Sequence, residues 1–201
     1  LDKNLGPAEI LNNLERAQCN TVIYSKATAD KVEANLGEID FVKNFINMDY
    51  VADLAANHPE VYFWDVLAKG YEIRKQDKSY DELELDPEAF SILLFTSGTT
   101  SKSKAVMLSH KNICAVVNGA PSMVDLKEAT CLSILPLHHT YEATCGFLIQ
   151  IYLGNTIAVG DGLRHIVKNA AQAKVTLFLM VPAILEAIYK SGKSAIETAD
   201  K

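Results

Sequence analysis

The sequence predicts an α/β fold, a mainly parallel sheet layered with helices on both faces, from the alternation of its apolar runs and from the turn residues between them. Short apolar runs alternate with longer segments of helical periodicity over residues 89–201. Residues that favour turns separate the two kinds of segment, as at Gly154-Asn155. Hydrophobic residues make up 49% of the 201-residue chain and charged residues 22%, which is typical of a globular protein that can bury a substantial core.

The first part of the chain is predicted to open with a helix. Pro7 suits the first helical turn, and Glu9 complements the positive end of the helix dipole. Ile10 and Leu14 then fall on one apolar face. The elements expected after this helix are a strand at 21–24, a helix at 27–36 ended by Gly37, a strand at 45–48 and a helix at 60–71.

A charge-rich segment over 72–88 interrupts this pattern. Asp86-Pro87 excludes a helix there, because the residue before a proline avoids helical backbone angles. We interpret the segment as a loop that joins two sub-parts, 1–71 and 89–201, of one domain over 1–201. Beyond the loop, strands are expected at 91–95, 131–134, 155–159 and 176–180, and helices at 109–120, 139–153, 163–173 and 182–191.

The order of these elements predicts where a ligand would bind. Strands that alternate with helices form parallel sheets, and such sheets bind ligands beyond the carboxyl ends of their strands. One loop follows the strand at 91–95, and a second, Leu135-Pro136-Leu137, follows the strand at 131–134. We therefore expect the two loops to border one crevice.

Charge and cysteine usage exclude several classes of protein. The net charge of −6 argues against a broad nucleic-acid surface, which would be basic. The four cysteines show no C-x-x-C spacing, which favours reduced, mostly buried thiols in a cytoplasmic protein and gives no metal site. The sequence has neither a membrane-spanning apolar stretch nor a signal peptide. Because it begins at Leu1 rather than Met, we expect a fragment of a longer protein.

The loop after the strand at 91–95 has the chemistry of an anion site. It reads Thr96-Ser97-Gly98-Thr99-Thr100-Ser101 and is followed by Lys102 and Lys104. Glycine allows a sharp turn and a close approach of the backbone, hydroxyls and amides donate hydrogen bonds, and the lysines supply positive charge. A solvated hydroxyl-rich turn is the alternative reading, but the position between a strand and lysines favours phosphate.

This loop does not fit the Walker-type phosphate loop. That motif, G-x-x-x-x-G-K-[ST], counted from Gly98, requires a second glycine where Ser103 stands. It also requires a Mg²⁺-binding serine or threonine where Ala105 stands. A Walker-type ATPase is therefore excluded.

Residues 95–110 instead resemble the signature of the adenylate-forming (AMP-binding) enzymes, which include acyl-CoA synthetases, luciferases and the adenylation domains of peptide synthetases. Their usual pattern is [YF]TSGTTGxPKGV, and this chain departs from it at Ser101, Ser103 and Ala105. The resemblance implies an incomplete N-terminal domain of such an enzyme over 1–201. It also implies that the phosphates of ATP are held by Thr96, Ser97, Gly98, Thr99, Thr100 and Lys104.

Two further segments are similar to the same family. Residues 135–142, LPLHHTYE, resemble its LPLxHxxE/G motif, and residues 176–189 resemble its strand–proline–helix step. The Tyr141-Glu142 pair is most like the long-chain fatty acid–CoA ligases. The resemblance implies that His139 is catalytic and that His139 and Glu142 belong to the substrate pocket. Taken alone, a His-His pair would indicate surface histidines.

The resemblance implies a function for the parent protein. It would activate a fatty acid with ATP and Mg²⁺ as an acyl-adenylate, and then form the thioester with coenzyme A. The chain has no match to the family's adenine-, ribose- and Mg²⁺-binding segments, so we expect the fragment itself to be inactive and to bind ATP weakly at best.

Three alternatives stay open. The chain could be a stand-alone nucleotide- or acyl-binding module that does not catalyse. The acid could be an aryl or amino acid instead of a fatty acid, although Tyr141-Glu142 favours the fatty acid. The apolar residues 147–153 could line an acyl tunnel, but plain core packing is favoured over that reading.

Overall fold

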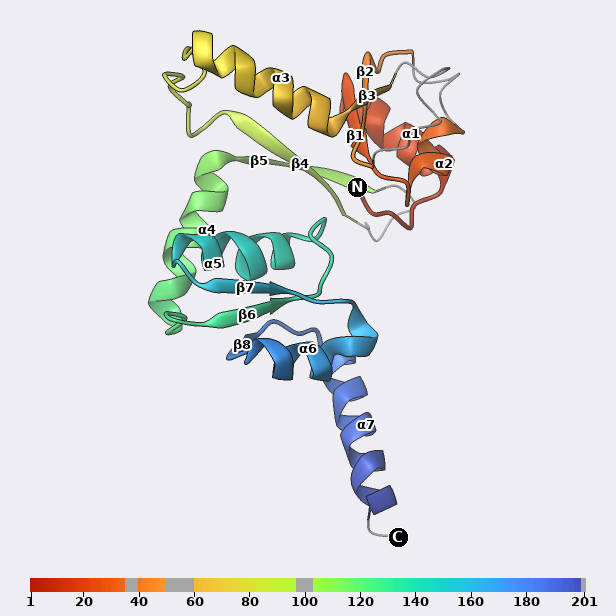
Figure 1. Ribbon diagram of the computed structural model, residues 1–201, viewed down its shortest axis with the longest axis vertical. Helices are drawn as coiled ribbons and strands as arrows, with labels where there is room; N and C mark the ends of the chain where they lie inside the picture. Colours follow the sequence, from red (N-terminus) through yellow and green to blue (C-terminus); the bar gives the residue numbers. More distant parts are fainter. Residues whose placement is uncertain (35–39, 50–59, 97–102, 200–201) are drawn as a thin grey trace. The chain divides into compact units, whose positions relative to one another are not determined.

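The computed structural model describes residues 1–34, 40–49, 60–96 and 103–199, and the side chains of 62–96 and 103–190 within the last two ranges. The chain divides into two compact units, Leu1–Leu108 and Ser109–Lys201, and each is described by itself. Residues 89–108, expected to belong to the sub-part 89–201, fall in the first unit. Figure 1 shows the elements in chain order.

The first unit is built on a small parallel sheet. Helix α1 (Pro7–Arg16), strand β1 (Thr21–Tyr24), helix α2 (Ala29–Glu33) and strands β2 (Asn44–Asn47) and β3 (Glu60–Tyr62) follow one another, and the sheet has the order β1-β2-β3. The strands pair in parallel, with Val22 opposite Phe45 and Ile46 opposite Val61. The core lies between this sheet and the helices, and it contains Ile10, Leu14, Val22, Tyr24, Val32, Val42 and Phe45.

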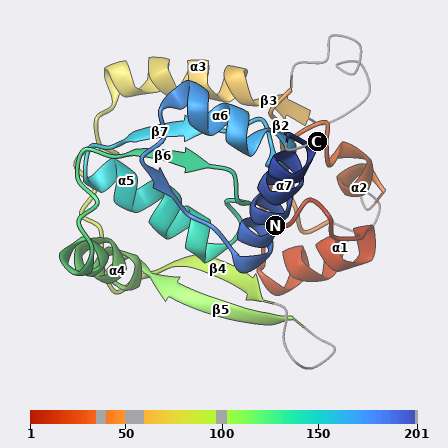
Figure 2. The same cartoon turned by 90° about the horizontal axis from the view of Figure 1, so that it is seen from below.

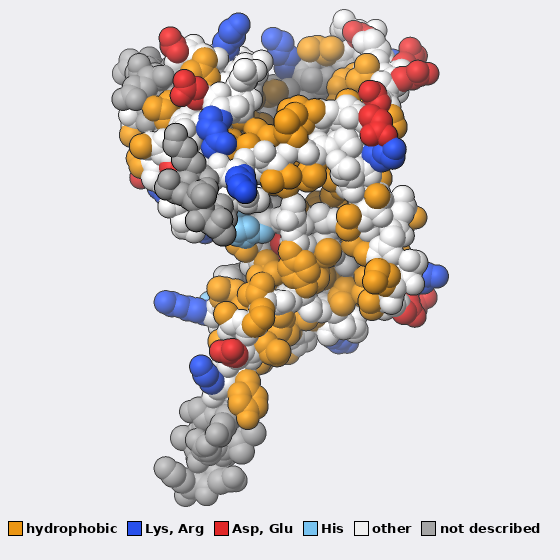
Figure 3. Space-filling model, turned by 180° about the vertical axis from the view of Figure 1, so that it is seen from behind, with side chains coloured by type: hydrophobic (Ala, Val, Ile, Leu, Met, Phe, Trp, Pro, Cys, Tyr) orange, Lys and Arg blue, Asp and Glu red, His pale blue; other side chains and the backbone are white. Residues whose placement is uncertain are grey.

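The expected helix at 60–71 is wrong at its start and too short at its end. Glu60–Tyr62 forms strand β3 because it can pair with β2, and helix α3 runs from Phe63 to Gln76. The expected loop over 72–88 therefore begins only after Gln76. Helix α3 has no buried residue, and its Trp64 is 66% exposed. Figure 3 shows hydrophobic side chains on much of one surface of the described residues.

Strands β4 (Phe90–Thr96) and β5 (Lys104–Ser109) form a separate two-stranded sheet. Figure 2 shows the two arrows pointing in opposite directions. The strand expected at 91–95 is confirmed, but it pairs with β5 instead of with another strand of a parallel sheet. The expectation that its loop and residues 135–137 border one crevice stays a prediction.

The second unit begins with helix α4 (His110–Met123), which is capped by Ser109. The Ser109 hydroxyl accepts from the Asn112 backbone, and the Asn112 side chain accepts from the Ser109 backbone, which together form a capping box. Strands β6 (Thr130–Ser133), β7 (Thr156–Val159) and β8 (Leu177–Phe178) form a parallel sheet in the order β7-β6-β8.

Helices cover both faces of this second sheet. Helix α5 (Ile149–Tyr152) lies on one face and α6 (Ile166–Ala173) on the other (Figure 1). The core contains Leu132, Ile166 and Ile184, and the last of these comes from α7 (Pro182–Ala199). The expected alternation of parallel strands and helices is therefore confirmed for this unit.

Two expected helices of the second unit differ in type from the prediction. Residues Glu142–Leu148, inside the expected helix at 139–153, form the π-helix η1, which continues directly into α5. The helix expected at 163–173 begins with a 3₁₀ turn, η2 (Leu163–His165), before α6. Helical periodicity predicted both segments, because the apolar spacing of α-, 3₁₀- and π-turns differs too little to separate them over one turn.

No helix within the described ranges combines the length and the hydropathy that a membrane span requires.

Candidate functional site

The ends of the predicted phosphate loop are held by the β4–β5 pair. Thr96 is the last residue of β4, Lys104 is the first residue of β5, and both are exposed. Because β4 and β5 are paired, these two residues come to the same end of the two-stranded sheet. A hydroxyl and an ammonium group are both donors that suit phosphate oxygens. The other predicted phosphate ligands, Ser97, Gly98, Thr99 and Thr100, lie outside the described residues.

Arg16 of helix α1 contacts Phe95 in β4 and Ser103, the residue before β5. Its Nη1 donates to the backbone oxygen of Ser103 at 2.9 Å and lies 3.3 Å from the Ser103 hydroxyl. Its guanidinium carbon lies 5.3 Å from the ring centre of Phe95. Sequence reasoning missed Arg16, since 87 residues separate it from Ser103 and an arginine in the last turn of a helix is common.

The histidine pair lies at the start of the helix that follows β6. The backbone N–H of His139 donates to the oxygen of Pro136 at 3.0 Å, and its carbonyl accepts from Ala143 at 3.0 Å. The ring of His139 is exposed and His138 is half-buried, with 4.2 Å between the ring centres. An exposed imidazole at a helix start is accessible to a ligand.

Glu142 lies in different surroundings from His139. It is fully buried, and Ser133 at the end of β6 donates its hydroxyl to Glu142 Oε1 at 2.5 Å. The other oxygen, Oε2, is buried without a hydrogen-bond partner among the described residues. Burial raises the pKa of the Glu142 carboxyl, and the bond from Ser133 offsets part of that rise. Of the two residues predicted for a substrate pocket, one is thus exposed and the other is enclosed.

The π-helix brings a glycine against the Glu142 carboxyl. A Cβ atom at Gly146 would lie 2.7 Å from Cδ and Oε2 of Glu142, closer than real side chains pack. Only glycine therefore leaves room for the carboxyl in this turn. Single π-turns inside α-helices are frequently found at functional sites, which makes the turn a candidate for a positioning role.

Two cysteines near this carboxyl are poor nucleophiles. Burial raises the pKa of the Cys131 thiol to about 11, and the negative charge of Glu142 adds to the rise. The same two causes raise the pKa of Cys145. Because the thiolate is the reactive form, neither cysteine is suited to nucleophilic catalysis at neutral pH.

The described residues differ in how well they suit the expected cofactors. Thr96 and Lys104 have the donors that ATP phosphates require. No group of three or more His, Cys, Asp or Glu side chains within the described ranges is arranged to hold a metal ion. The assignment of Thr96 and Lys104 to phosphate stays a prediction, and the described ranges show no cluster of these four side-chain types for Mg²⁺.

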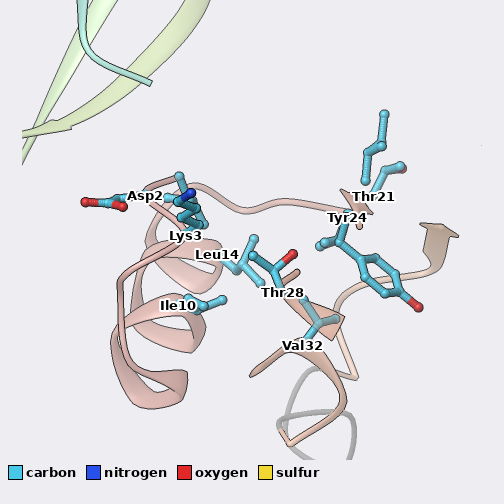
Figure 4. A pocket seen from close by; sticks show the side chains of 11 residues that line it. Asp2, Lys3, Ile10, Leu14, Thr21, Tyr24, Thr28 and Val32 are labelled. Carbon is cyan, nitrogen blue, oxygen red and sulfur yellow. The ribbon is translucent and has the colours of Figure 1, made fainter. Parts of the chain in front are cut away.

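A pocket of about 230 Å³ lies in the first unit between α1, β1 and α2. In Figure 4 the side chains of Leu14, Thr28 and Val32 point toward the same space. Ligand pockets commonly begin at about 300 Å³, and five of the eleven residues that line this one belong to the core of the unit. We therefore interpret it as a gap in core packing.

A second pocket, of about 330 Å³, lies in the second unit between α6 and α7. Its lining is apolar except for one arginine and comprises Leu163, Arg164, Ile166, Val167, Ala183, Ile184, Ala187 and Ile188. Residues 147–153, considered above for an acyl tunnel, do not line it. Within that segment Ile149 and Gln150 are buried, whereas Ile151 and Tyr152 are exposed.

The sequence model of the family described as AMP-binding enzyme matches residues 1–201. The chain is 23% identical to long chain acyl-CoA synthetase 8 of Arabidopsis thaliana, over 96% of this chain and 29% of that protein. It is 29% identical to the long-chain-fatty-acid–CoA ligase ACSBG2 of Xenopus laevis, over 73% of this chain and 21% of that protein. The chain thus spans less than a third of the length of these curated relatives.

Solved structures show the same fold. The N-terminal domain of FACL13 from Mycobacterium tuberculosis superposes on this chain with a TM-score of 0.68 and 21% identity. The match covers 92% of this chain and 44% of the FACL13 chain. A fatty acyl CoA synthetase from the same organism matches 92% of this chain with 34% of its own, at a TM-score of 0.72 and 19% identity. The expected fold class, part of an N-terminal domain of this type, is confirmed.

Proposed function

Because the chain belongs to the family of AMP-binding enzymes, we propose that it is part of an ATP-dependent fatty acid–CoA ligase. The observation that carries the proposal is the match of that family over residues 1–201. Curated relatives named as long-chain acyl-CoA synthetases and ligases support the fatty acid as substrate. The position of Thr96 and Lys104 at one end of the β4–β5 pair is consistent with a shared phosphate ligand.

The reaction we propose has two steps. The carboxylate of the fatty acid attacks the α-phosphate of ATP, the bond to the β-phosphate breaks, and pyrophosphate leaves the acyl-adenylate. The thiol of coenzyme A then attacks the acyl carbon, loses its proton and releases AMP. Such chemistry depends mainly on positioning the reactants and on stabilising charge.

We assign the leaving pyrophosphate to the hydroxyl-rich loop and its lysine. The hydroxyls of Thr96, Ser97, Thr99 and Thr100, the N–H of Gly98 and the ammonium of Lys104 would donate to its oxygens. Mg²⁺ carried in with ATP would neutralise part of the charge that develops on the same oxygens. We assign its ligands to parts of the protein other than the described residues.

His139 and Glu142 have separate roles in this proposal. The exposed imidazole of His139 would contact the fatty acid carboxylate and orient it toward the α-phosphate. Glu142 is enclosed beneath the same helix start and would act on the substrate pocket by fixing that start to Ser133 of β6. Glu142 is thus a positioning residue and His139 the catalytic one.

We also propose that the 201-residue chain alone forms no acyl-adenylate and that the parent protein works in the cytoplasm. The compartment stays a prediction, since relatives include proteins named as peroxisomal and chloroplastic. Sustained thioester formation by the purified 201-residue chain would contradict the first of these statements.

The test is acid-dependent exchange between ATP and pyrophosphate, measured on the whole protein with short, medium and long fatty acids and with an aryl and an amino acid. We expect the fastest exchange with long fatty acids and a loss of at least tenfold in Lys104→Ala, because a charge-assisted phosphate contact is removed. Lys78→Ala, an exposed lysine in the loop after α3, is the matched control and should exchange like wild type.

The same experiment decides between the proposal and the binding-module alternative. A folded protein that binds ATP but exchanges with none of the acids would be a nucleotide-binding module without catalysis. Exchange with the aryl or amino acid alone would keep the ligase and correct its substrate.

A further inference from the structure

We propose that Arg16 is a positioning residue for Thr96 and Lys104, the two described ends of the predicted phosphate loop, and that it fixes the spacing between the strands that carry them. The proposal rests on the proposed function of those two residues. It does not involve the residues between them: it concerns only Phe95, which precedes Thr96, and Ser103, which precedes Lys104.

Arg16 extends from a well-packed helix end of the first unit. It is the last residue of α1, and the residues Asn13 and Leu14 just before it are buried. The helix end is closed by hydrogen bonds from Ala17 to Asn13 and from Cys19 to Leu14. A side chain that leaves such an anchored helix end can hold its partners in a fixed place.

The guanidinium holds each strand by a different interaction. Nη1 donates to the Ser103 backbone oxygen at 2.9 Å, with the Ser103 hydroxyl 3.3 Å away, and this secures the start of β5. The aromatic ring of Phe95, 5.3 Å from the guanidinium carbon, attracts the same cation and secures the end of β4. One planar group thus contacts the immediate neighbours of both described phosphate ligands.

A fixed spacing matters because the two ligands come from different strands. If Thr96 and Lys104 were free to move apart, ATP binding would have to order them, and that ordering would weaken affinity. Arg16 orders them before ATP arrives. Its effect should therefore appear in the affinity for ATP and not in the affinity for the acid.

Two other roles for Arg16 make different predictions. A cation that serves only the dipole of α1 would contact the last carbonyls of its own helix, whereas the Arg16 guanidinium donates to Ser103. An arginine that acts only through its positive charge would be replaced well by lysine. A positioning arginine would not, because lysine lacks the planar group that reaches a backbone oxygen and an aromatic face together.

The first test measures ATP–pyrophosphate exchange on the whole protein with Arg16→Ala and Arg16→Lys. We expect both to raise KM for ATP about fivefold, with KM for the fatty acid unchanged, in keeping with the loss of one exposed charge-assisted contact. Arg74→Ala and Arg74→Lys are the matched controls, because Arg74 is exposed in the same unit and pairs with Asp81 in the loop after α3. They should leave both KM values unchanged.

Two results would overturn the proposal. If Arg16→Ala binds ATP like wild type, Arg16 does not act on the loop. If Arg16→Lys alone restores the wild-type KM for ATP, Arg16 acts by charge and not by position.

The second test needs no catalytic activity. Deuterium uptake at the backbone amides of residues 104–107 is compared in wild type, Arg16→Ala and Arg74→Ala without ligand. We expect uptake to rise at least threefold in rate for Arg16→Ala only. Faster deuterium uptake in Arg16→Ala, found together with no ATP–pyrophosphate exchange by the wild type, would support the role of Arg16 and contradict the proposed function. Unchanged uptake would overturn the role of Arg16, whatever the activity.

Discussion

The hydroxyl of Ser133 donates to the carboxyl of Glu142 at 2.5 Å and so joins the end of strand β6 to the first turn of the π-helix η1. The carboxyl has no exposed surface, and its other oxygen has no hydrogen-bond partner among the described residues. Glu142 also lies only three residues along the chain from the exposed ring of His139. The position of the proposed catalytic histidine therefore depends on a buried polar contact.

Ser133→Ala should destabilise the protein by about 1–3 kcal/mol, because both oxygens of a buried carboxyl would then lack a partner. Urea denaturation at pH 7, followed by circular dichroism, measures the change. Ser91→Ala is the control, since Ser91 is exposed and bonds only to a nearby backbone oxygen. Equal decreases in the free energy of unfolding of Ser133→Ala and Ser91→Ala would contradict this prediction.

Glu142→Gln should make stability less dependent on pH. The pKa of the carboxyl is raised in the folded protein, so the folded state binds more protons than the unfolded state above the ordinary value of 4.5. Stability of the wild type therefore falls as pH rises from 4.5 toward the raised pKa and then levels off. Urea denaturation at several values from pH 4 to pH 8 should show the unfolding free energy of the variant rising relative to that of the wild type. A constant difference would count against a raised pKa.

Gly146→Ala should cost about 1–3 kcal/mol, because its methyl group would lie within 2.7 Å of the Glu142 carboxyl and force it to move. Gly119→Ala is the matched helical control, since nothing lies within 4 Å of a Cβ there. That control should be neutral or stabilising by about 0.5–1 kcal/mol. Thermal denaturation of the two variants should shift the midpoint in opposite directions, and similar shifts would refute the argument.

The cysteines should differ in their reaction with iodoacetamide. Cys114 is exposed and should be alkylated first, whereas Cys131 is fully buried with a pKa of about 11 and should react slowest at pH 8. Mass spectrometry of digested protein, sampled over time, measures each rate. Glu142→Gln should speed the reaction of Cys131, because it removes the negative charge that contributes to the raised pKa. An unchanged alkylation rate of Cys131 in that variant would show that the charge of Glu142 does not affect the thiol.

His139→Ala should lower kcat/KM for the fatty acid by about tenfold to a hundredfold while KM for ATP stays within twofold, because the imidazole is proposed to orient the acid. Steady-state thioester formation by the whole protein gives both constants. His165→Ala, in the 3₁₀ turn before α6, is the control histidine. An equal rise in both KM values would indicate a general loss of structure instead.

Several elements could be predicted from sequence because their signals are local. The strands β1, β6 and β7 were located to within about a residue, since each is a short apolar run between turn residues. The start of α1 followed from Pro7, and the end of α5 from Gly154, whose positive φ of 70° favours glycine. The phosphate role of Thr96 and Lys104 comes from the hydroxyl-rich sequence and the resemblance to the family's signature, and it stays a prediction.

The features that escaped prediction depend on contacts between distant residues. Strand β3 exists because residues 60–62 pair with β2, which no local pattern reveals. The burial of Glu142 follows from packing against β6, and an acidic residue in the first turns of a helix is ordinarily exposed. Arg16 became a candidate only when the fold brought it to Ser103.

The contact between Arg16 and Ser103 also has a consequence for how the protein acquires its structure. Helix α1 and the capped start of α4 need only neighbouring residues, so they can form early. The Arg16 contact has to wait until 87 further residues have been synthesised and the chain between has been brought together. The contact of Arg16 with Ser103 should therefore form late in folding, after helix α1.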